Sequence, residues 1–458
     1  MGIENKRIVT VQGKVRNSIP ILGKRERKRM KEKMKLTKLE KSWILYDIGN
    51  SAFILLVATL LPIYFNSLAT AAGVSESNYL AYWGYAGSVA TILVAIIGPL
   101  CGTLADRKGY KKPLFMGAML LGALACLGLG AAWSWLSFLV IFVVARVGYS
   151  SSLVFYDAML PEITTPERMD RVSTSGYAFG YIGSCIPFAL CLVLALCYES
   201  FGISQVTALI IGFAITGAWW FACSLPLMKH YKQTAYQPPV KGAFLQTFRQ
   251  LWQTIKEAKK QKHIFLYLIA FFFFIDGVYT IIDMATAYGK SLGLDTTGLL
   301  LALLVTQIVA FPFSILFGRL AGKYDTGLLL KICILSYTGI ALFAIFLTSL
   351  VQFWILAVLV GMFQGGIQAL SRSYLGKIIP ADESGKYYGL MDIFGKGASF
   401  VGTTMVALVS QLTDGLEFSF LGLTVVNTGI AVGSLALLFV IGFSLFCVAD
   451  KLCKAQKA

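Results

Sequence analysis

The sequence has little of what an enzyme active site requires. Its 458 residues include only two histidines, His230 and His263, and neither an H-E-x-x-H nor a G-x-S-x-G motif occurs. Residues 389–397 imitate a phosphate-binding loop, but one residue too many separates the glycines, and Gly397 stands where Ser or Thr should bind magnesium. These absences indicate a protein that is not an enzyme and that has no catalytic residues, no cofactor and no metal site.

Paired cysteines and charges are also scarce. The nine cysteines are spaced singly without a C-x-x-C pair, which argues against both zinc sites and disulfides. Only 14% of the residues are charged and 57% are hydrophobic, whereas soluble domains carry about 25% charged residues. This composition predicts a membrane protein.

The hydrophobic residues are gathered in long runs. A helix needs about 20 apolar residues to span a bilayer. Twelve runs approach or exceed this length, at 43–69, 79–101, 114–132, 135–156, 173–197, 205–227, 264–288, 296–317, 328–350, 353–376, 387–411 and 420–448. The sequence therefore predicts an all-α membrane protein with twelve transmembrane helices.

Lysine and arginine are distributed unevenly between the loops. They crowd the chain before residue 42, the turn at 105–112, the segment 229–263 and the tail after 450, and they are absent from 70–78, 132–134, 198–204 and 412–419. Because positively charged loops tend to stay in the cytoplasm, both termini are predicted to be cytoplasmic.

The net charge of +17 comes largely from this pattern and from the first forty residues. The basic segment 1–42 has two interpretations: it binds anionic lipid head groups, or it is a disordered tail that only enforces topology. Nucleic acid is not expected as a partner. No apolar region follows the early basic residues before the first full span, so a cleaved signal peptide is not expected.

The chain repeats itself weakly at a spacing of 216 residues. Gly102-Thr-Leu-Ala and Gly318-Arg-Leu-Ala stand at equivalent helix ends, and Phe179-Gly180 and Phe394-Gly395 recur at nearly the same spacing. The second copy is degraded, because Gly322 stands where the first has Asp106. Such a repeat predicts two pseudo-symmetric six-helix halves related by an axis along the membrane normal. The halves are expected at 43–227 and 264–450, with a cytoplasmic tail at 451–458.

A polar linker at 228–263 joins the expected halves. It contains apolar residues at helical spacing, namely Phe244, Leu245, Phe248, Leu251, Trp252 and Ile255, with basic residues elsewhere around the helix. The pattern predicts an amphipathic helix that lies on the inner membrane surface. Capture of this helix by a calmodulin-like partner is the alternative.

Ionisable residues inside the spans are rare, and each costs about 2.5 to 3.5 kcal/mol at a helix centre, so each is a candidate for function. Arg146 and Asp276 lie nearest the midplane, and Asp283 follows Asp276 on the same helix face. We expect both aspartates to face one cavity and Arg146 to oppose Asp276. If transport is coupled to protons, Asp276 is expected to carry them. A buried Arg146–Asp276 pair that only fixes packing is the alternative.

Other polar residues in the spans form patterns of their own. Gln364, Gln368 and Arg372 follow i,i+4 spacing, so one polar stripe of the tenth span should face protein or water. The positions nearer the cytoplasm suit gating or interhelical contacts, and they are Asp47, Asn50, Asp392 and Lys396.

Residues 102–114, G-T-L-A-D-R-K-G-Y-K-K-P-L, form a charged turn between two apolar runs. Their spacing resembles the G-x(3)-D-R-x-G-x-[KR]-[KR] motif that joins helices two and three in the major facilitator superfamily. The resemblance implies that the cytoplasmic side is latched between the two halves by Gly102, Asp106, Arg107, Gly109 and Lys111. Gly109 would permit the tight turn.

Three further segments narrow the resemblance. Residues 43–53 (WILYDIGNSAF), 155–162 (FYDAMLPE, which contains the gating candidate Asp157) and 365–372 (GGIQALSR) look like the Atg22-like, or UMF1, branch of that superfamily. With the charged turn, the resemblance covers almost everything from residue 43 to residue 448. Members of the branch are regarded as solute effluxers, and the fungal vacuolar proteins are associated with amino-acid release.

The resemblance implies a secondary active transporter that works by alternating access around a cavity lined by helices 1, 4, 7 and 10. The charges in the spans favour a small polar or zwitterionic solute, and the resemblance implies amino-acid efflux. A drug or lipid exporter on the same fold and a non-transporting receptor or scaffold are the alternatives. The expected location is the cell membrane, or the vacuolar membrane if the source is fungal.

Overall fold

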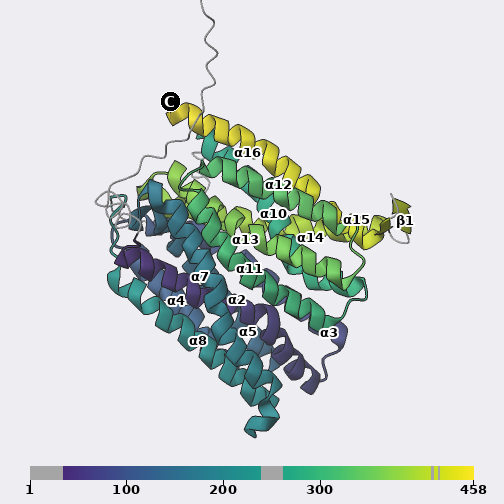
Figure 1. The fold of residues 1–458 in the computed structure, drawn as a ribbon. Coiled ribbons are helices and arrows are strands. Elements are labelled where there is room, and N and C mark those ends of the chain that lie inside the picture. Colours follow the sequence, from purple (N-terminus) through teal and green to yellow (C-terminus); the bar gives the residue numbers. More distant parts are fainter. Residues whose placement is uncertain (1–34, 239–260, 414–416, 421–422, 458) are drawn as a thin grey trace, which may run out of the picture. The chain divides into compact units, whose positions relative to one another are not determined.

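The structure is a computed structural model that describes residues 35–238, 261–413, 417–420 and 423–457. Most of the basic segment 1–42 and all of the amphipathic helix expected at residues 244–255 lie outside this range. The unit Lys38–Ala458 is compact. Its fold is nearly all helical in the described residues (Figure 1).

The helices fall into two groups along the chain. The N-terminal group comprises α2 (Lys38–Ala71), α3 (Glu76–Ala105), α4 (Lys111–Gly128), α5 (Trp135–Ala158), α6 (Leu160–Ile163), α7 (Pro166–Leu196) and α8 (Gln205–His230). The C-terminal group comprises α10 (Lys262–Ser291), α11 (Thr296–Leu320), α12 (Thr326–Ala344), α13 (Leu350–Ile378), α14 (Ser384–Leu412), α15 (Asn427–Gly433) and α16 (Ala436–Lys457). Short 3-10 turns lie at Leu129–Ala131, Tyr198–Phe201 and Ala381–Glu383.

Within the described residues, eleven helical stretches are long and apolar enough to cross a membrane. The chain is therefore a multi-pass membrane protein. The helix α14 has 29 residues, but its side chains at 396–400 lie outside the described residues, and its described part contributes the shorter apolar helix Val401–Leu412. The predicted runs otherwise coincide with helices, although several helices extend beyond the apolar run that predicted them.

The last predicted run differs from expectation. Where a continuous helix over 420–448 was expected, the antiparallel hairpin of β1 (Glu417–Phe420) and β2 (Leu423–Val426) comes first, and two turn residues then separate α15 from α16. The sequence of β2, Leu-Thr-Val-Val, is rich in the β-branched residues that favour strands. Hydrophobicity alone does not distinguish such a strand from a helix end.

Capping side chains fix where the spans begin. Ser134 and Ser349 open α5 and α13 with complete capping boxes. Four more helices, α3, α8, α11 and α12, begin after a side chain that accepts a backbone N–H, and these caps are Ser75, Ser204, Asp295 and Asp325. Each cap satisfies an N–H group that the first helical turn leaves unpaired.

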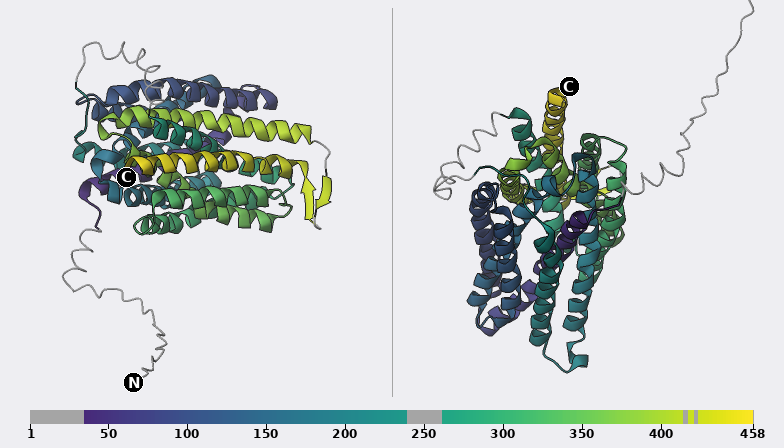
Figure 2. Two further views of the ribbon diagram at one scale, coloured as in Figure 1. Left: turned by 90° about the horizontal axis from the view of Figure 1, so that it is seen from above. Right: turned by 90° about the vertical axis from the view of Figure 1, so that its left-hand side faces the viewer.

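The bundle has two ends that matter for function. The carboxyl end of α16 lies at one end and the β1–β2 hairpin at the opposite end (Figures 1 and 2). We call the first the Asp106 end, because the turn after α3 lies there, and the second the hairpin end. The N-terminal and C-terminal groups are joined mainly by α3 packing against α14 and by α7 packing against α11 and α13, and α5 also packs against α14.

Candidate functional site

Arg372, on α13 of the C-terminal group, reaches into the N-terminal group. Its guanidinium donates to Asp157 of α5 at 3.0 Å and lies 3.4 Å from Asp47 of α2. It also donates to the hydroxyl and the carbonyl oxygen of Ser173 on α7. One side chain thus joins three N-terminal helices to α13. We call these four residues the Arg372 cluster.

Two rings and a glycine shape this cluster. The guanidinium carbon of Arg372 lies 4.5 Å from the ring centres of both Trp43 and Tyr177, close enough for cation–π attraction. A Cβ atom on Gly176 would lie 2.6 Å from the carboxylate of Asp47, so any larger residue would crowd the ion pair. Arg372 is 3% exposed, and its charge therefore depends on the two carboxylates for compensation.

The turn after α3 makes a second contact between the groups. Asp106 accepts the backbone N–H groups of Gly385 and Lys386 at 2.7 and 2.8 Å. A carboxylate from the N-terminal group therefore caps the N-terminus of α14, where the helix dipole favours negative charge. Lys111 lies 2.6 Å from Glu162 and donates to Ser384 at 2.8 Å. We call the set of residues in these contacts the Asp106 cluster: Asp106, Lys111, Glu162, Ser384, Gly385 and Lys386.

Glycines bring α3 and α14 into backbone contact beside this cap. A Cβ atom on Gly102 would lie 2.3 Å from the carbonyl oxygen of Gly385, and one on Gly389 would lie 2.9 Å from that of Gly98. Both helices thus carry the G-x-x-x-G spacing that lets membrane helices approach closely. This close approach is a physical reason to expect that Gly102 contributes to gating.

The first residues of the linker hold the turn in place. Gln233 accepts the backbone N–H of Gly109 at 2.9 Å, and Arg107 donates to a backbone carbonyl of the same segment at 2.8 Å. Gly109 has a φ of 83°, a conformation that favours glycine. Gln233 could not be identified from the sequence, because no periodicity or motif marks a single polar loop residue.

A third contact between the two helix groups involves Asp170 on α7. The sequence did not predict this contact. Asp170 pairs with Lys377 of α13 and accepts from the hydroxyls of Thr326 and Ser373 at 2.7 and 2.6 Å. Asp170 and Lys377 each stand near the Asp106 end of a span, which is the one signal that could have suggested them. Together with the Arg372 and Asp106 clusters, this contact closes the Asp106 end.

Deeper in the bundle, Arg146 on α5 and Asp283 on α10 come from opposite groups. The charge of Arg146 acts on Asp283 and on Tyr149, and Asp283 also acts on Tyr279. Among the described residues, no hydrogen bond or ion pair engages Asp283, and Nη1 of Arg146 is buried without a partner. The charges of Arg146 and Asp283 therefore interact, but no ion pair joins these two described residues. We call these four residues the central cluster.

The structure differs from the expected pairing of Arg146 with Asp276. Asp276 is fully buried, and one of its carboxylate oxygens accepts from the N–H of Gly402 at 2.9 Å and from the hydroxyl of Thr280 at 3.2 Å. Asp283 is exposed, so the two aspartates do not share one cavity in this conformation. A spacing of seven residues fixes the side of the helix, but it does not fix which neighbour covers that side.

The polar stripe of α13 faces protein, as predicted. Gln368 accepts from the hydroxyl of Tyr181 on α7 at 3.2 Å, Gln364 is 5% exposed, and Arg372 lies at the centre of its cluster. The stripe therefore borders the N-terminal group along its length. Oε1 of Gln364 is buried and has no hydrogen-bond partner among the described residues.

Asn50 and Asp392 are two other predicted gating positions. Asn50 donates to the carbonyl oxygen of Tyr46 in its own helix at 3.0 Å. Asp392 lies beside Gly98, whose added Cβ atom would be 3.4 Å from the carboxylate. The side chain of Lys396 lies outside the described residues, so its pairing with Asp392 stays a prediction.

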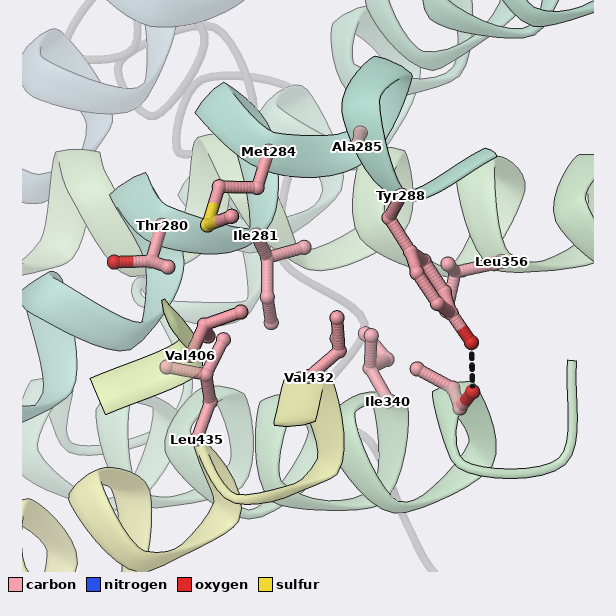
Figure 3. Close-up of a pocket in the computed structure, with 11 residues that line it drawn as sticks. Thr280, Ile281, Met284, Ala285, Tyr288, Ile340, Leu356, Val406, Val432 and Leu435 are labelled. Carbon is pink, nitrogen blue, oxygen red and sulfur yellow. Dashed lines mark hydrogen bonds between the residues drawn. The ribbon is translucent and has the colours of Figure 1, made fainter. Parts of the chain in front are cut away.

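An apolar cavity lies inside the C-terminal group, away from these polar clusters (Figure 3). Its volume is about 20 Å³, enough for one water molecule. The lining includes Ile281, Met284, Tyr288 and Val432, and the Tyr288 hydroxyl donates to the carbonyl oxygen of Ala344 at 2.6 Å. Such a cavity is too small and too apolar to hold a polar solute.

The chain is similar in sequence to proteins described as membrane transporters and effluxers. The family described as "Vacuole effluxer Atg22 like" matches residues 37–444. The chain is 40% identical over 413 residues to the uncharacterized MFS-type transporter YxiO of Bacillus subtilis, covering 89% of this chain and 94% of that protein. It is 21% identical to autophagy-related protein 22 of Coccidioides immitis, covering 76% of this chain and 71% of that one.

Solved structures share the fold at low sequence identity. A bacterial homologue of the iron transporter ferroportin, in an outward-facing state with soaked iron, superposes with a TM-score of 0.65 at 14% identity, covering 90% of this chain and 98% of that one. The MFS transporter FucP in its outward conformation gives a TM-score of 0.65 at 16% identity, covering 90% and 97%. At these identities the likeness concerns the fold alone.

Proposed function

The chain belongs to the Atg22-like effluxer family of MFS-type transporters, and from that premise we propose that it moves a small polar or zwitterionic solute by alternating access. Arg372 carries this proposal, because its buried charge is compensated by carboxylates of the other helix group. Separating the groups at the Asp106 end would break these ion pairs and expose both partners to water. Contacts of this kind suit an interface that opens and closes.

We further propose that the chain has twelve spans, with α14 as the eleventh, in two six-helix halves. The Asp106 end would face the cytoplasm, because the positively charged loops gather there. On α10, Asp276 is 0% exposed and Asp283, two turns nearer the hairpin end, is exposed. This gradient and the closed Asp106 end support an outward-facing conformation. The 40% identity to a Bacillus subtilis protein favours the plasma membrane.

The central cluster supports the choice of solute. An anionic group of the solute would bind Arg146 and a cationic group would bind Asp283, since neither forms an ion pair with another described residue. The hydroxyls of Tyr149 and Tyr279 add hydrogen-bonding groups between them. An α-amino acid carries both charged groups on one carbon atom, so amino acids are the first solutes to test.

Counterflow in proteoliposomes tests the function. Vesicles containing purified protein and a mixture of unlabelled amino acids should take up labelled amino acids faster than protein-free vesicles. Labelled lipid and labelled hydrophobic cations serve as the comparison cargoes. Uptake of those cargoes alone would support a drug or lipid exporter, and no uptake of any cargo by folded protein would support a receptor or scaffold.

Gly102→Ala tests the role of the closed Asp106 end. The new methyl group would overlap the carbonyl oxygen of Gly385, and overpacking costs about 1 to 3 kcal/mol. We expect the closed population to fall roughly 5- to 150-fold. This change should be measured as a longer mean distance between spin labels at Tyr110 and Tyr324. The control is Gly117→Ala on α4, where an added Cβ meets nothing within 4 Å. An unchanged label distance would contradict the prediction.

Asp106 should make this closure dependent on pH. Burial raises the pKa of Asp106 from 3.8 to about 7, although Lys111 opposes the shift. Hydration in the open state should return the pKa to its ordinary value, so the closed state binds more protons between about pH 4 and 7. Closure should therefore strengthen as the pH falls through this range and weaken as the pH rises through 7.

The spin-label pair at Tyr110 and Tyr324 also measures this effect, with Asp106→Asn as the comparison. The asparagine cannot ionise, so the part of the pH dependence that comes from Asp106 should be lost and the distance should change less with pH. Asp106→Asn should slow turnover but leave solute affinity within about threefold, because Asp106 lies far from the central cluster. Loss of equilibrium solute binding by a normally folded Asp106→Asn protein would show that the turn does more than gate.

A further inference from the structure

Asp276 is a carboxylate enclosed within the C-terminal group. Its side chain is on α10, it is 0% exposed, and α14 covers it through Gly402. One carboxylate oxygen accepts two hydrogen bonds, from Gly402 and Thr280. The second oxygen, Oδ2, is buried and has no hydrogen-bond partner among the described residues.

Among the side chains that the structure describes, none forms an ion pair with Asp276. On the α16 side, Phe439 packs against Gly277, and Phe274 packs against Gly442. On α14, the described neighbour is the backbone of Gly402, and on α10 itself Asp283 is a like charge. The side chain of Lys396 lies outside the described residues, so the variant Lys396→Met is needed to test whether it neutralises Asp276. An ionised carboxylate without a counter-charge is strongly disfavoured at such a position.

Gly402 has a specific part in this arrangement. An added Cβ atom would lie 2.6 Å from Oδ1 of Asp276 and 2.2 Å from the hydroxyl oxygen of Thr280. The absence of a side chain therefore lets α14 close directly over the carboxyl group. In Figure 3 the hydroxyl oxygen of Thr280 points away from the apolar cavity, in agreement with its hydrogen bond to Asp276. The site is thus separate from that cavity.

We propose that Asp276 binds the coupling proton in a site occluded between α10 and α14, apart from the solute that binds at the central cluster. This inference rests on the proposed transport function. In the present conformation the proton is bonded to Oδ2. When α14 moves away from α10, water reaches the carboxyl group, the O–H bond breaks, and its electron pair stays on the carboxylate while the proton passes to water.

The proton and the solute therefore occupy different places, and their coupling runs through the packing of α14 against α10. Exchange of solute across the membrane does not require Asp276 to change its protonation state. Net accumulation of solute against its concentration gradient does require Asp276 to change its protonation state. This difference separates a proton site from a solute site in experiment.

Dicyclohexylcarbodiimide, which reacts with protonated carboxyl groups in apolar surroundings, tests the site without any solute. The carboxyl oxygen bonds to the central carbon of the reagent and the proton moves to its nitrogen, so no group leaves. Mass spectrometry of purified protein at pH 6 should find the adduct on the peptide that carries Asp276, and Asp276→Asn should remove it. Labelling of Asp283 but not of Asp276 would overturn the proposal, whatever the result of counterflow.

Transport by Asp276→Asn provides the second test, with Glu199→Gln as the matched control because Glu199 is exposed. Amino-acid accumulation driven by a pH gradient should be lost, while counterflow of the same labelled amino acids should stay within twofold of the wild type. Wild-type protein without counterflow would refute the transport function instead. Loss of both activities in Asp276→Asn would make Asp276 part of the solute site and overturn the proposal.

Lys396→Met tests whether the ammonium group of Lys396 on α14 neutralises Asp276. If Asp276 holds a proton, Lys396→Met should leave the carbodiimide labelling of Asp276 unchanged. If Lys396 instead neutralises Asp276, the wild-type protein should resist labelling and Lys396→Met should permit it, which would overturn the proposal. Accumulation driven by a sodium gradient but not by a pH gradient would overturn it equally.

Discussion

Replacing Arg372 with lysine is expected to reduce the rate of solute counterflow by roughly 100-fold or more. Arg372 donates to Asp157 and Ser173 and lies within 3.4 Å of Asp47, and one ammonium group cannot reproduce that planar set of donors. Breaking a buried ion pair costs about 3 to 5 kcal/mol, and about 1.4 kcal/mol corresponds to a tenfold change. The closed Asp106 end would therefore lose most of its population.

The matched control is Arg319→Lys, since Arg319 is an exposed arginine near the end of α11. A second variant guards against a folding failure: Arg372→Gln combined with Asp157→Asn removes a charge from both partners and should transport better than Arg372→Gln alone. Thermal unfolding in detergent establishes that each protein is folded. Counterflow by Arg372→Lys within twofold of the wild type would show that the Arg372 cluster does not control closure.

Arg146→Gln and Asp283→Asn are each expected to weaken binding of a zwitterionic solute by roughly 10- to 150-fold. The estimate follows from the loss of one hydrogen bond to a charged group, which is worth about 1.5 to 3 kcal/mol. Binding isotherms of purified protein with the amino acid that gives the strongest counterflow measure the change. Arg319→Gln and Glu199→Gln, at exposed positions, serve as the charge controls.

Solute analogues sharpen this test. An amino-acid amide lacks the carboxylate, so its weaker binding should be nearly insensitive to Arg146→Gln. An N-acetyl amino acid lacks the ammonium group, so its binding should be nearly insensitive to Asp283→Asn. If both variants bind the unmodified amino acid within twofold of the wild type, the solute binds elsewhere and the central cluster has another role.

Much of the fold was predictable because membrane helices follow local rules. Long apolar runs predicted the helices, and serine or aspartate caps mark where several of them begin. The exception, at β1 and β2, arose because a short apolar segment rich in β-branched residues satisfies the same hydrophobicity criterion as a helix. The count of spans also depends on α14, whose side chains at 396–400 lie outside the described residues.

The candidate site was predictable in composition but not in pairing. The charged turn at 102–114 and the polar stripe ending in Arg372 were visible in the sequence, since both follow regular spacings. The partner of Asp106 is a backbone helix terminus, which no residue pattern can identify. Asp170 and Gln233 were missed because a single polar residue at a helix end or in a loop carries no periodic signal.

The sequence by itself determined that this chain lies in a membrane as a bundle of long helices, because burial of apolar side chains and satisfaction of backbone hydrogen bonds act over a few residues at a time. It also determined which few charges enter the bundle. Only the tertiary structure decided how those charges meet. Arg372 pairs with residues 215 and 325 positions away, and Asp276 is sealed by Gly402 and not opposed by Arg146. Such contacts depend on how helices pack against each other, and helical periodicity fixes only the face of each helix.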